Sequence, residues 1–257
     1  MLKVQYASDL HLEYPRNREF LEKNPLAPKG DILILAGDII TDKQRDKIAP
    51  LYEKWRGQFR QIISLPGNHE FYGGEVMYCY PNYRTELAPN HILVNNETVV
   101  VDHVRFIVSI LWTHIPEPKM ARLEKASNDY RLIQYYKDDE LQRRITAEAV
   151  NELHTLSRHF LETELMKPFV GKTVVVTHHL PSYALMGFAA YNDVLKYYCA
   201  SNLNKLIKEN DIDYWIFGHW HQSVQKRMFN TMFVSNPLGY MTEEQHREFL
   251  PAAYFEI

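Results

Sequence analysis

The chain has 257 residues, of which 46% are hydrophobic and 24% charged, with a formal net charge of -3 at pH 7. These values are typical of a soluble globular protein with one large α/β domain or two small ones. The near balance of charge excludes a strongly basic surface that would bind nucleic acid through bulk electrostatics. There is no internal repeat and no linker rich in Gly, Ser or Pro, so we expect a single domain over residues 1–257.

The two cysteines, Cys79 and Cys199, are far apart and form no CxxC motif. A disulfide scaffold is therefore not expected, and a reducing compartment fits. The N-terminal stretch MLKVQYASDLHL has no long apolar segment of the kind found in signal peptides. No run approaches the ~18 apolar residues of a membrane helix. We therefore expect a cytoplasmic protein without a membrane partner.

Several short apolar runs rich in Val, Ile, Leu, Tyr or Phe end abruptly in polar residues, which favours buried strands. Five of these runs lie at residues 2–8, 31–37, 59–67, 173–177 and 213–218. Further strands are predicted at residues 91–102, 104–112, 232–236 and 253–257.

Helical patterns lie between the strands, at 43–57, 139–166 and 193–209, and Pro50 predicts a break or kink in the first. Alternating strands and helices indicate a layered α/β fold. The irregular stretch around 113–145 is predicted to be an insertion on the rim of the sheet, where it could form a lid or a substrate wall.

Polar side chains follow five of the predicted strands. In open α/β sheets, ligands gather where strands end at their carboxyl ends. Each motif alone is weak, but their repeated placement behind apolar runs indicates a metal site. The motifs are SDLH with Asp9 and His11, AGDI with Asp38, PGNHE with Asn68 and His69, VTHHLP with His178 and His179, and FGHWH with His219 and His221.

In this order, the motifs D-x-H, GD, GNHE, H and GHxH resemble those of the calcineurin-like metallophosphoesterase superfamily, over residues 9 to 221. The resemblance implies a two-sheet αββα sandwich with a dinuclear metal site at the carboxyl ends of the strands. It also implies that Asp38 bridges the two metals and that His69 is a non-ligand histidine that contacts the phosphate. The remaining ligands would be Asp9, His11 and His221 for one metal, and Asn68, His178 and His219 for the other.

The sequence leaves two features of the site undecided, namely one metal ligand and the partner of His69. Either His178 or His179 could be the ligand, and we favour His178 because it follows the strand directly, which leaves His179 to support the site or face substrate. The superfamily often has GDxxD, whose second Asp orients the catalytic His. This chain has Thr41 at that place, so the partner of His69 could be Asp42, Glu70 or no residue at all.

The ligand types suit Mn, Fe, Co or Zn, with Mn first among them, because imidazole and carboxylate donors are combined. Two divalent ions outweigh the charge of Asp9, Asp38 and a bridging hydroxide, so the centre would attract a phosphate ester anion. We hypothesise that the bridging hydroxide attacks phosphorus. His69, in its protonated form, would stabilise the transition state or protonate the leaving oxygen.

We therefore predict a metal-dependent phosphohydrolase for a small phosphodiester or phosphomonoester. Tyr183 could stack on an aromatic leaving group, and Asn128, Asp129 and Tyr130 are candidates for a substrate wall.

A nuclease is an alternative but would need a basic track, and basic pairs such as Arg143-Arg144 are sparse. A non-catalytic scaffold is disfavoured because every ligand position holds a competent residue. The sequence does not indicate an oligomeric state.

Overall fold

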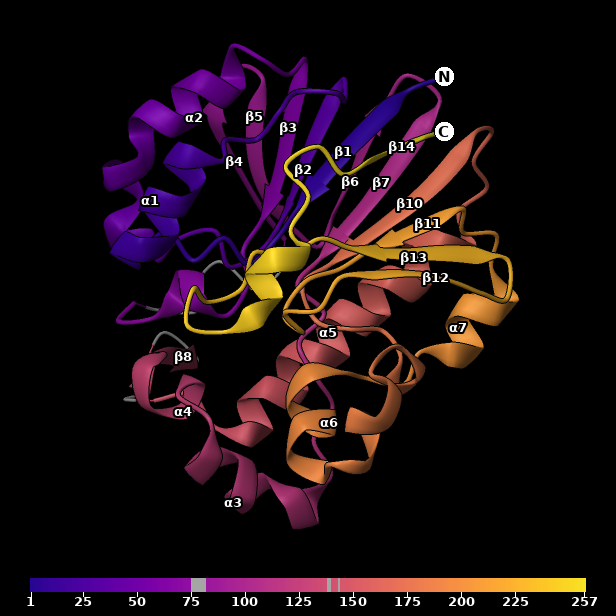
Figure 1. Ribbon diagram of the computed structural model, residues 1–257. Coiled ribbons are helices and arrows are strands. Elements are labelled where there is room, and N and C mark those ends of the chain that lie inside the picture. The colour runs from indigo at the N-terminus through magenta and orange to yellow at the C-terminus, as the bar shows by residue number, and fades with distance from the viewer. Residues whose placement is uncertain (75–81, 138–139, 143) are drawn as a thin grey trace.

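The computed structural model describes residues 1–74, 82–137, 140–142 and 144–257, so Cys79 and Arg143 lie outside the described residues. Two six-stranded sheets pack face to face, and helices cover their outer faces (Figure 1). This arrangement confirms the predicted α/β fold with an αββα sandwich. A single-domain organisation stays a prediction.

The first sheet has the strand order β14-β1-β2-β3-β5-β4. Its central strands β1, β2, β3 and β5 are parallel, and the edge strands β14 and β4 are antiparallel to their neighbours. The strands span Lys3–Ala7 (β1), Ile32–Ala36 (β2), Gln61–Leu65 (β3), Tyr83–Ala88 (β4), His91–Asn95 (β5) and Tyr254–Glu256 (β14).

The second sheet has the order β12-β13-β11-β10-β7-β6, in which β7, β10, β11 and β13 are parallel. Its edge strands β6 and β12 are antiparallel to their neighbours. The strands span Glu97–Val101 (β6), Val104–Ser109 (β7), Lys172–Thr177 (β10), Tyr214–Ile216 (β11), Val224–Met228 (β12) and Thr231–Ser235 (β13). A separate hairpin joins Tyr135–Lys137 (β8) to Glu140–Gln142 (β9).

Among the described residues, the buried clusters at the layer interfaces hold the layers together. Val4, Ile34 and Ile63 of the first sheet meet Phe106 and Val174 of the second in the cluster between the sheets. The outer face of the first sheet packs on α1 and α2, and the outer face of the second packs on α5 and α7 (Figure 1). The helices span Pro15–Lys23 (α1), Ala49–Arg56 (α2), Glu117–Ala126 (α3), Asp129–Leu132 (α4), Ala147–Met166 (α5), Asp193–Cys199 (α6) and Asn204–Glu209 (α7).

The predicted strand at 91–102 is wrong as one element, because β5 and β6 belong to different sheets. The chain crosses between them at Asn96, whose φ is 49°, a left-handed value that asparagine tolerates better than most residues. The side-chain oxygen of Asn95 accepts the Ile110 N–H, and that of Asn96 accepts the Ser109 hydroxyl. These bonds fix the crossing, which periodicity alone does not show.

Two predicted helices differ from the observed ones. The helix expected at 139–166 begins only at Ala147, because Thr146 caps it by accepting the Ala149 N–H. The helix expected at 193–209 is divided into α6 and α7. Between them, Leu180 donates to the Cys199 carbonyl and accepts from Ser201, which holds this segment extended.

The break predicted near Pro50 is confirmed. A 3₁₀ helix over Asp42–Ile48 precedes α2, and Pro50 lies in the first turn of α2, where its missing N–H costs no helical hydrogen bond. In the part of the chain that the structure describes, no helix is long and apolar enough to cross a membrane.

Candidate metal centre

The predicted ligands lie in loops at the carboxyl ends of parallel strands. Asp9 follows β1, Asp38 follows β2 and Asn68 follows β3, whereas His178 follows β10 and His219 follows β11. The loops of the two sheets touch, because Gly218 lies against Asp9 and Ala36. The two sheets therefore bring their ligand candidates to one place.

The backbone is strained at these positions. Asp9, His11, Asp38, His219 and His221 have φ values between 46° and 66°. Left-handed backbone is uncommon for residues other than glycine and costs of order 1–3 kcal/mol each in sparsely populated regions. Such strain is typical of functional sites, where the surrounding structure holds side chains in a required direction.

Glycines allow the loops to approach each other. A Cβ at Gly37 would lie 2.3 Å from His178 Nδ1, and one at Gly67 would lie 2.2 Å from Asp38 Oδ1. A Cβ at Gly218 would lie 2.7 Å from Asp9 Oδ2. The three glycines that directly precede Asp38, Asn68 and His219 thus leave space for the side chains of the other motifs.

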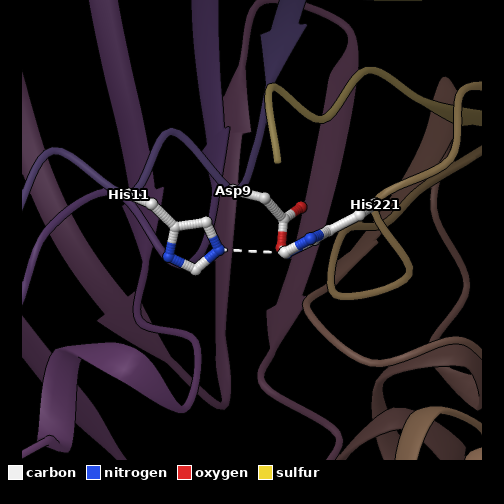
Figure 2. Close-up of side chains that lie close together, drawn as sticks. All are labelled: Asp9, His11 and His221. Carbon is white, nitrogen blue, oxygen red and sulfur yellow. Dashed lines mark hydrogen bonds and ion pairs between the residues drawn. The ribbon is translucent and has the colours of Figure 1, made fainter. Parts of the chain in front are cut away.

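One group of ligand candidates consists of Asp9, His11 and His221. Figure 2 shows the three side chains pointing toward one another. His221 Nε2 lies 3.0 Å from His11 Nε2 and 3.5 Å from Asp9 Oδ1. Three donor atoms of this kind, so close together, can hold a transition-metal ion.

A second group consists of Asp38, His178 and His219. His178 Nε2 lies 3.5 Å from Asp38 Oδ2 and 3.2 Å from both Asn68 Oδ1 and His219 Nδ1. Asp38 Oδ2 also lies 3.8 Å from His11 Nε2. The Asp38 carboxylate is therefore placed between the two groups.

The donor set fits divalent metal ions. The Nδ1 atoms of His11, His178 and His221 face Glu13, the Ala36 carbonyl and Glu243, at 3.1, 2.9 and 3.1 Å. These contacts favour a proton on Nδ1 and leave Nε2 for a metal. His219 presents Nδ1 instead, which lies 3.2 Å from His178 Nε2, so all four histidines turn one ring nitrogen toward the ligand groups.

Electrostatics couples the acids to the histidines. Burial favours neutral Asp38, but the charges of His178 and His69 hold the pKa of Asp38 well below its ordinary value. Burial disfavours protonated His178, yet Asp38 and Asp9 raise the pKa of His178 to about 9. Burial also lowers the pKa of His221, but Asp9 and Glu243 outweigh that effect and raise this pKa to about 10. A metal ion would displace these ligand protons, so binding would release them.

His69 lies beside both groups, in the 3₁₀ helix His69–Phe71, and its backbone N–H donates to Asp38 Oδ1. Its Nδ1 lies 2.9 Å from Glu13 Oε1, and its Nε2 lies 3.1 Å from the Tyr240 hydroxyl. Burial lowers the pKa of His69, but the charges of Asp38 and Glu13 outweigh that effect and raise it. With His11 and Asp38, His69 forms a third group of possible ligands, and its non-ligand role stays a prediction.

Glu13 and Asp129 take part in the site in ways that sequence reasoning missed. Glu13, not Asp42 or Glu70, faces His69, and its place two residues after His11 in DLHLE was the available signal. Asp129 Oδ1 accepts from Asn68 Nδ2 at 2.9 Å and from the Tyr72 hydroxyl at 2.7 Å. Asp129, which lies in the 113–145 segment, thus contacts the proposed ligand Asn68 and can orient its side chain.

The two substrate candidates occupy different positions. His179 is buried, stacks on Trp112 and packs against the His219 ring, so the structure places it behind the ligand groups rather than on an open surface. Tyr183 contacts the Tyr197 ring and the Lys196 ammonium. Neither observation tests substrate binding, and both assignments stay predictions.

A cavity of about 270 Å³ opens next to His69. Four tyrosines contribute to its wall, and the rest comes from α3, α6 and the loop before α4. Among the described residues, no lysine or arginine lines the cavity, and its lining includes Tyr14, Tyr72, Tyr198, Tyr240, Leu123, Asn128 and Leu195. The cavity therefore suits a small uncharged organic group.

Known proteins resemble this chain in sequence or in structure. Residues 2–223 match the family model of the calcineurin-like phosphoesterases. An uncharacterized protein of Acanthamoeba polyphaga mimivirus is 30% identical over 292 aligned positions, covering 99% of this chain and 96% of that protein. Among solved structures, a phosphopantetheinyl hydrolase from Mycobacterium tuberculosis has a TM-score of 0.66 at 18% identity, covering 96% of this chain and 92% of that one. A dimetal phosphatase from Danio rerio has a TM-score of 0.46 at 13% identity, covering 95% and 90%.

Proposed function

The chain belongs to the calcineurin-like phosphoesterases and is a metal-dependent phosphoesterase, and from that premise we propose that it hydrolyses a small organic phosphate ester at a two-metal centre built around Asp38. The observation that carries this proposal is the position of the Asp38 carboxylate, with His11 on one side and His178 on the other. A carboxylate so placed suits the bridge between two divalent ions.

We propose Asp9, His11 and His221 as the remaining ligands of one ion, and Asn68, His178 and His219 as those of the other. Two ions bound there would supply Lewis acidity and a nucleophile at neutral pH. Mn²⁺ is the first ion to test, because carboxylate and amide oxygens suit it and imidazole suits neighbouring transition metals.

In this proposal His69 acts on the leaving group. Its raised pKa favours the imidazolium form, which can donate a proton from Nε2 to the departing oxygen. The Tyr240 hydroxyl marks the direction of Nε2, and both residues line the cavity described above. The leaving group of the ester would therefore occupy this cavity, where aromatic rings exclude water and bind an uncharged organic group.

The test is hydrolysis of p-nitrophenyl phosphate and bis-p-nitrophenyl phosphate by the Mn²⁺-loaded protein, with Asp38→Asn as the control. We expect turnover of at least one ester by the wild-type protein and loss of dinuclear binding and turnover in the variant. The preferred ester decides between phosphomonoesterase and phosphodiesterase activity. Full activity of Asp38→Asn would contradict the proposed bridge, and a wild-type protein that binds no metal would support a non-catalytic scaffold.

A further inference from the structure

Glu13 lies outside all the metal motifs, in the loop between β1 and α1, yet its side chain is only 7% exposed. Its Oε1 atom lies 3.1 Å from His11 Nδ1 and 2.9 Å from His69 Nδ1. A single carboxylate oxygen therefore faces a proposed metal ligand and the proposed acid at the same time. The two rings also touch, with centroids 4.4 Å apart.

The other acidic side chains considered for this role have different partners. The Glu70 carboxylate accepts the backbone N–H groups of Asp38, Ile39 and Gly67, so it supports the loop after β2. Asp42 forms an ion pair with Arg45. Among the described residues, Glu13 is thus the acid whose carboxylate faces the His69 ring, at Nδ1.

We propose that Glu13 is a positioning residue that couples metal binding to leaving-group protonation, by holding a proton on Nδ1 of both His11 and His69. This inference rests on the proposed function. With Nδ1 protonated, His11 presents the lone pair of Nε2 toward His221 and Asp38, where a metal would bind. His69 with both nitrogens protonated directs Nε2 toward Tyr240 and the cavity.

The position of Glu13 suits this role. Its Oε1 can accept hydrogen bonds from Nδ1–H of His11 and of His69 at the same time. Hydrogen bonds to a carboxylate are stronger than those to a neutral amide, so a glutamine of the same shape would hold the two protons less firmly.

The test compares Glu13→Gln with Glu243→Gln. Glu243 is a matched control because its Oε2 lies 3.1 Å from His221 Nδ1, in the same ligand group as His11, and the structure shows no bond from it to His69 among the described residues. Two quantities are measured for each variant. The first is Mn²⁺ affinity by calorimetry, and the second is the rate ratio of a p-nitrophenyl ester to an alkyl ester of the same phosphate at saturating Mn²⁺.

The ratio reports leaving-group protonation, because p-nitrophenolate departs without a proton and an alkoxide does not. We expect both variants to bind Mn²⁺ roughly 10–100-fold more weakly. Only Glu13→Gln should raise the ratio, by at least about tenfold and by no more than the roughly 10²–10⁴-fold that a general acid contributes in full. In a His69→Ala background, Glu13→Gln should leave the ratio unchanged.

Unchanged Mn²⁺ affinity or an unchanged ratio in Glu13→Gln would overturn the proposal, as would a raised ratio in Glu243→Gln. Glu13→Asp keeps the charge but shortens the side chain, so it should lose one of the two histidine contacts and shift at least one of the two quantities. Histidine ¹⁵N NMR of the Zn²⁺-loaded protein provides a readout without substrate. In Glu13→Leu, whose side chain has no acceptor, loss of the Nδ1–H signals of His11 and His69 is expected, and their retention would contradict the role of Glu13 even if the wild-type protein hydrolysed no ester.

Discussion

Gly67 is the glycine whose replacement should affect both ligand groups at once. A Cβ at this position would lie 2.2 Å from Asp38 Oδ1 and 2.6 Å from His178 Cε1 and Nε2. Neither neighbour can move freely, because Asp38 Oδ1 accepts the His69 N–H at 2.8 Å and His178 Nδ1 faces the Ala36 carbonyl at 2.9 Å. The substitution Gly67→Ala must therefore displace at least one proposed ligand.

The magnitude follows from the cost of overpacking, which is typically 1–3 kcal/mol for an extra methyl group in a well-packed site. If about 2 kcal/mol of that cost falls on the metal-bound state, the affinity for metal should decrease roughly 30-fold, since about 1.4 kcal/mol corresponds to a factor of ten. Because Asp38 lies between the two groups, we expect both binding steps to weaken.

Gly57→Ala is the matched control. A Cβ at Gly57 would lie 3.5 Å from its nearest neighbour, the Lys54 carbonyl, and φ is -74°, which alanine adopts without strain. This variant should be neutral or more stable by about 0.4–1 kcal/mol and should bind metal normally. Calorimetric titration with Mn²⁺ and urea unfolding of both variants measure these effects. Wild-type affinity at both steps in Gly67→Ala would refute the steric reasoning.

Two further predictions concern a buried histidine and a buried acid. Burial, together with Arg56 and Arg45, lowers the pKa of His91 to about 3, so the folded state keeps His91 neutral while the unfolded state gains a proton below its pKa of 6.5. The free energy of unfolding should therefore decrease as the pH is lowered. Between pH 7 and pH 5 the wild-type protein should lose about 2 kcal/mol more of this free energy than His91→Gln. Urea midpoints that change in parallel across that range would contradict this. Asp129→Asn can turn its NH₂ group toward Asn68 and should weaken Mn²⁺ binding roughly 10–100-fold. Unaltered calorimetric affinity would show that Asp129 does not orient Asn68.

The sequence predicts the core of the fold well, because apolar runs such as 31–37 are buried from both sides and are followed by polar motifs. The sequence also predicts that the residues of the two ligand groups lie close together, because parallel strands end at a common edge. These features depend on local patterns that repeat along the chain.

Features that depend on long-range contacts were not predictable. The division of the 193–209 helix follows from a bridge between Leu180 and Ala200, which periodicity does not reveal. The roles of Glu13 and Asp129 depend on single contacts across 56 and 61 positions of sequence, to His69 and Asn68. The spacing of Glu13 from His11 in DLHLE is a local signal, but it does not identify His69 as a second partner.

The proposed function depends on Asp38 bridging two metal ions. Anomalous diffraction from crystals of the Mn²⁺-loaded protein would locate the ions. We expect two peaks roughly 3.5–4 Å apart, with Asp38 bonded to both, one near His11 and His221 and the other near His178 and His219. A single peak, or two peaks without Asp38 between them, would contradict it.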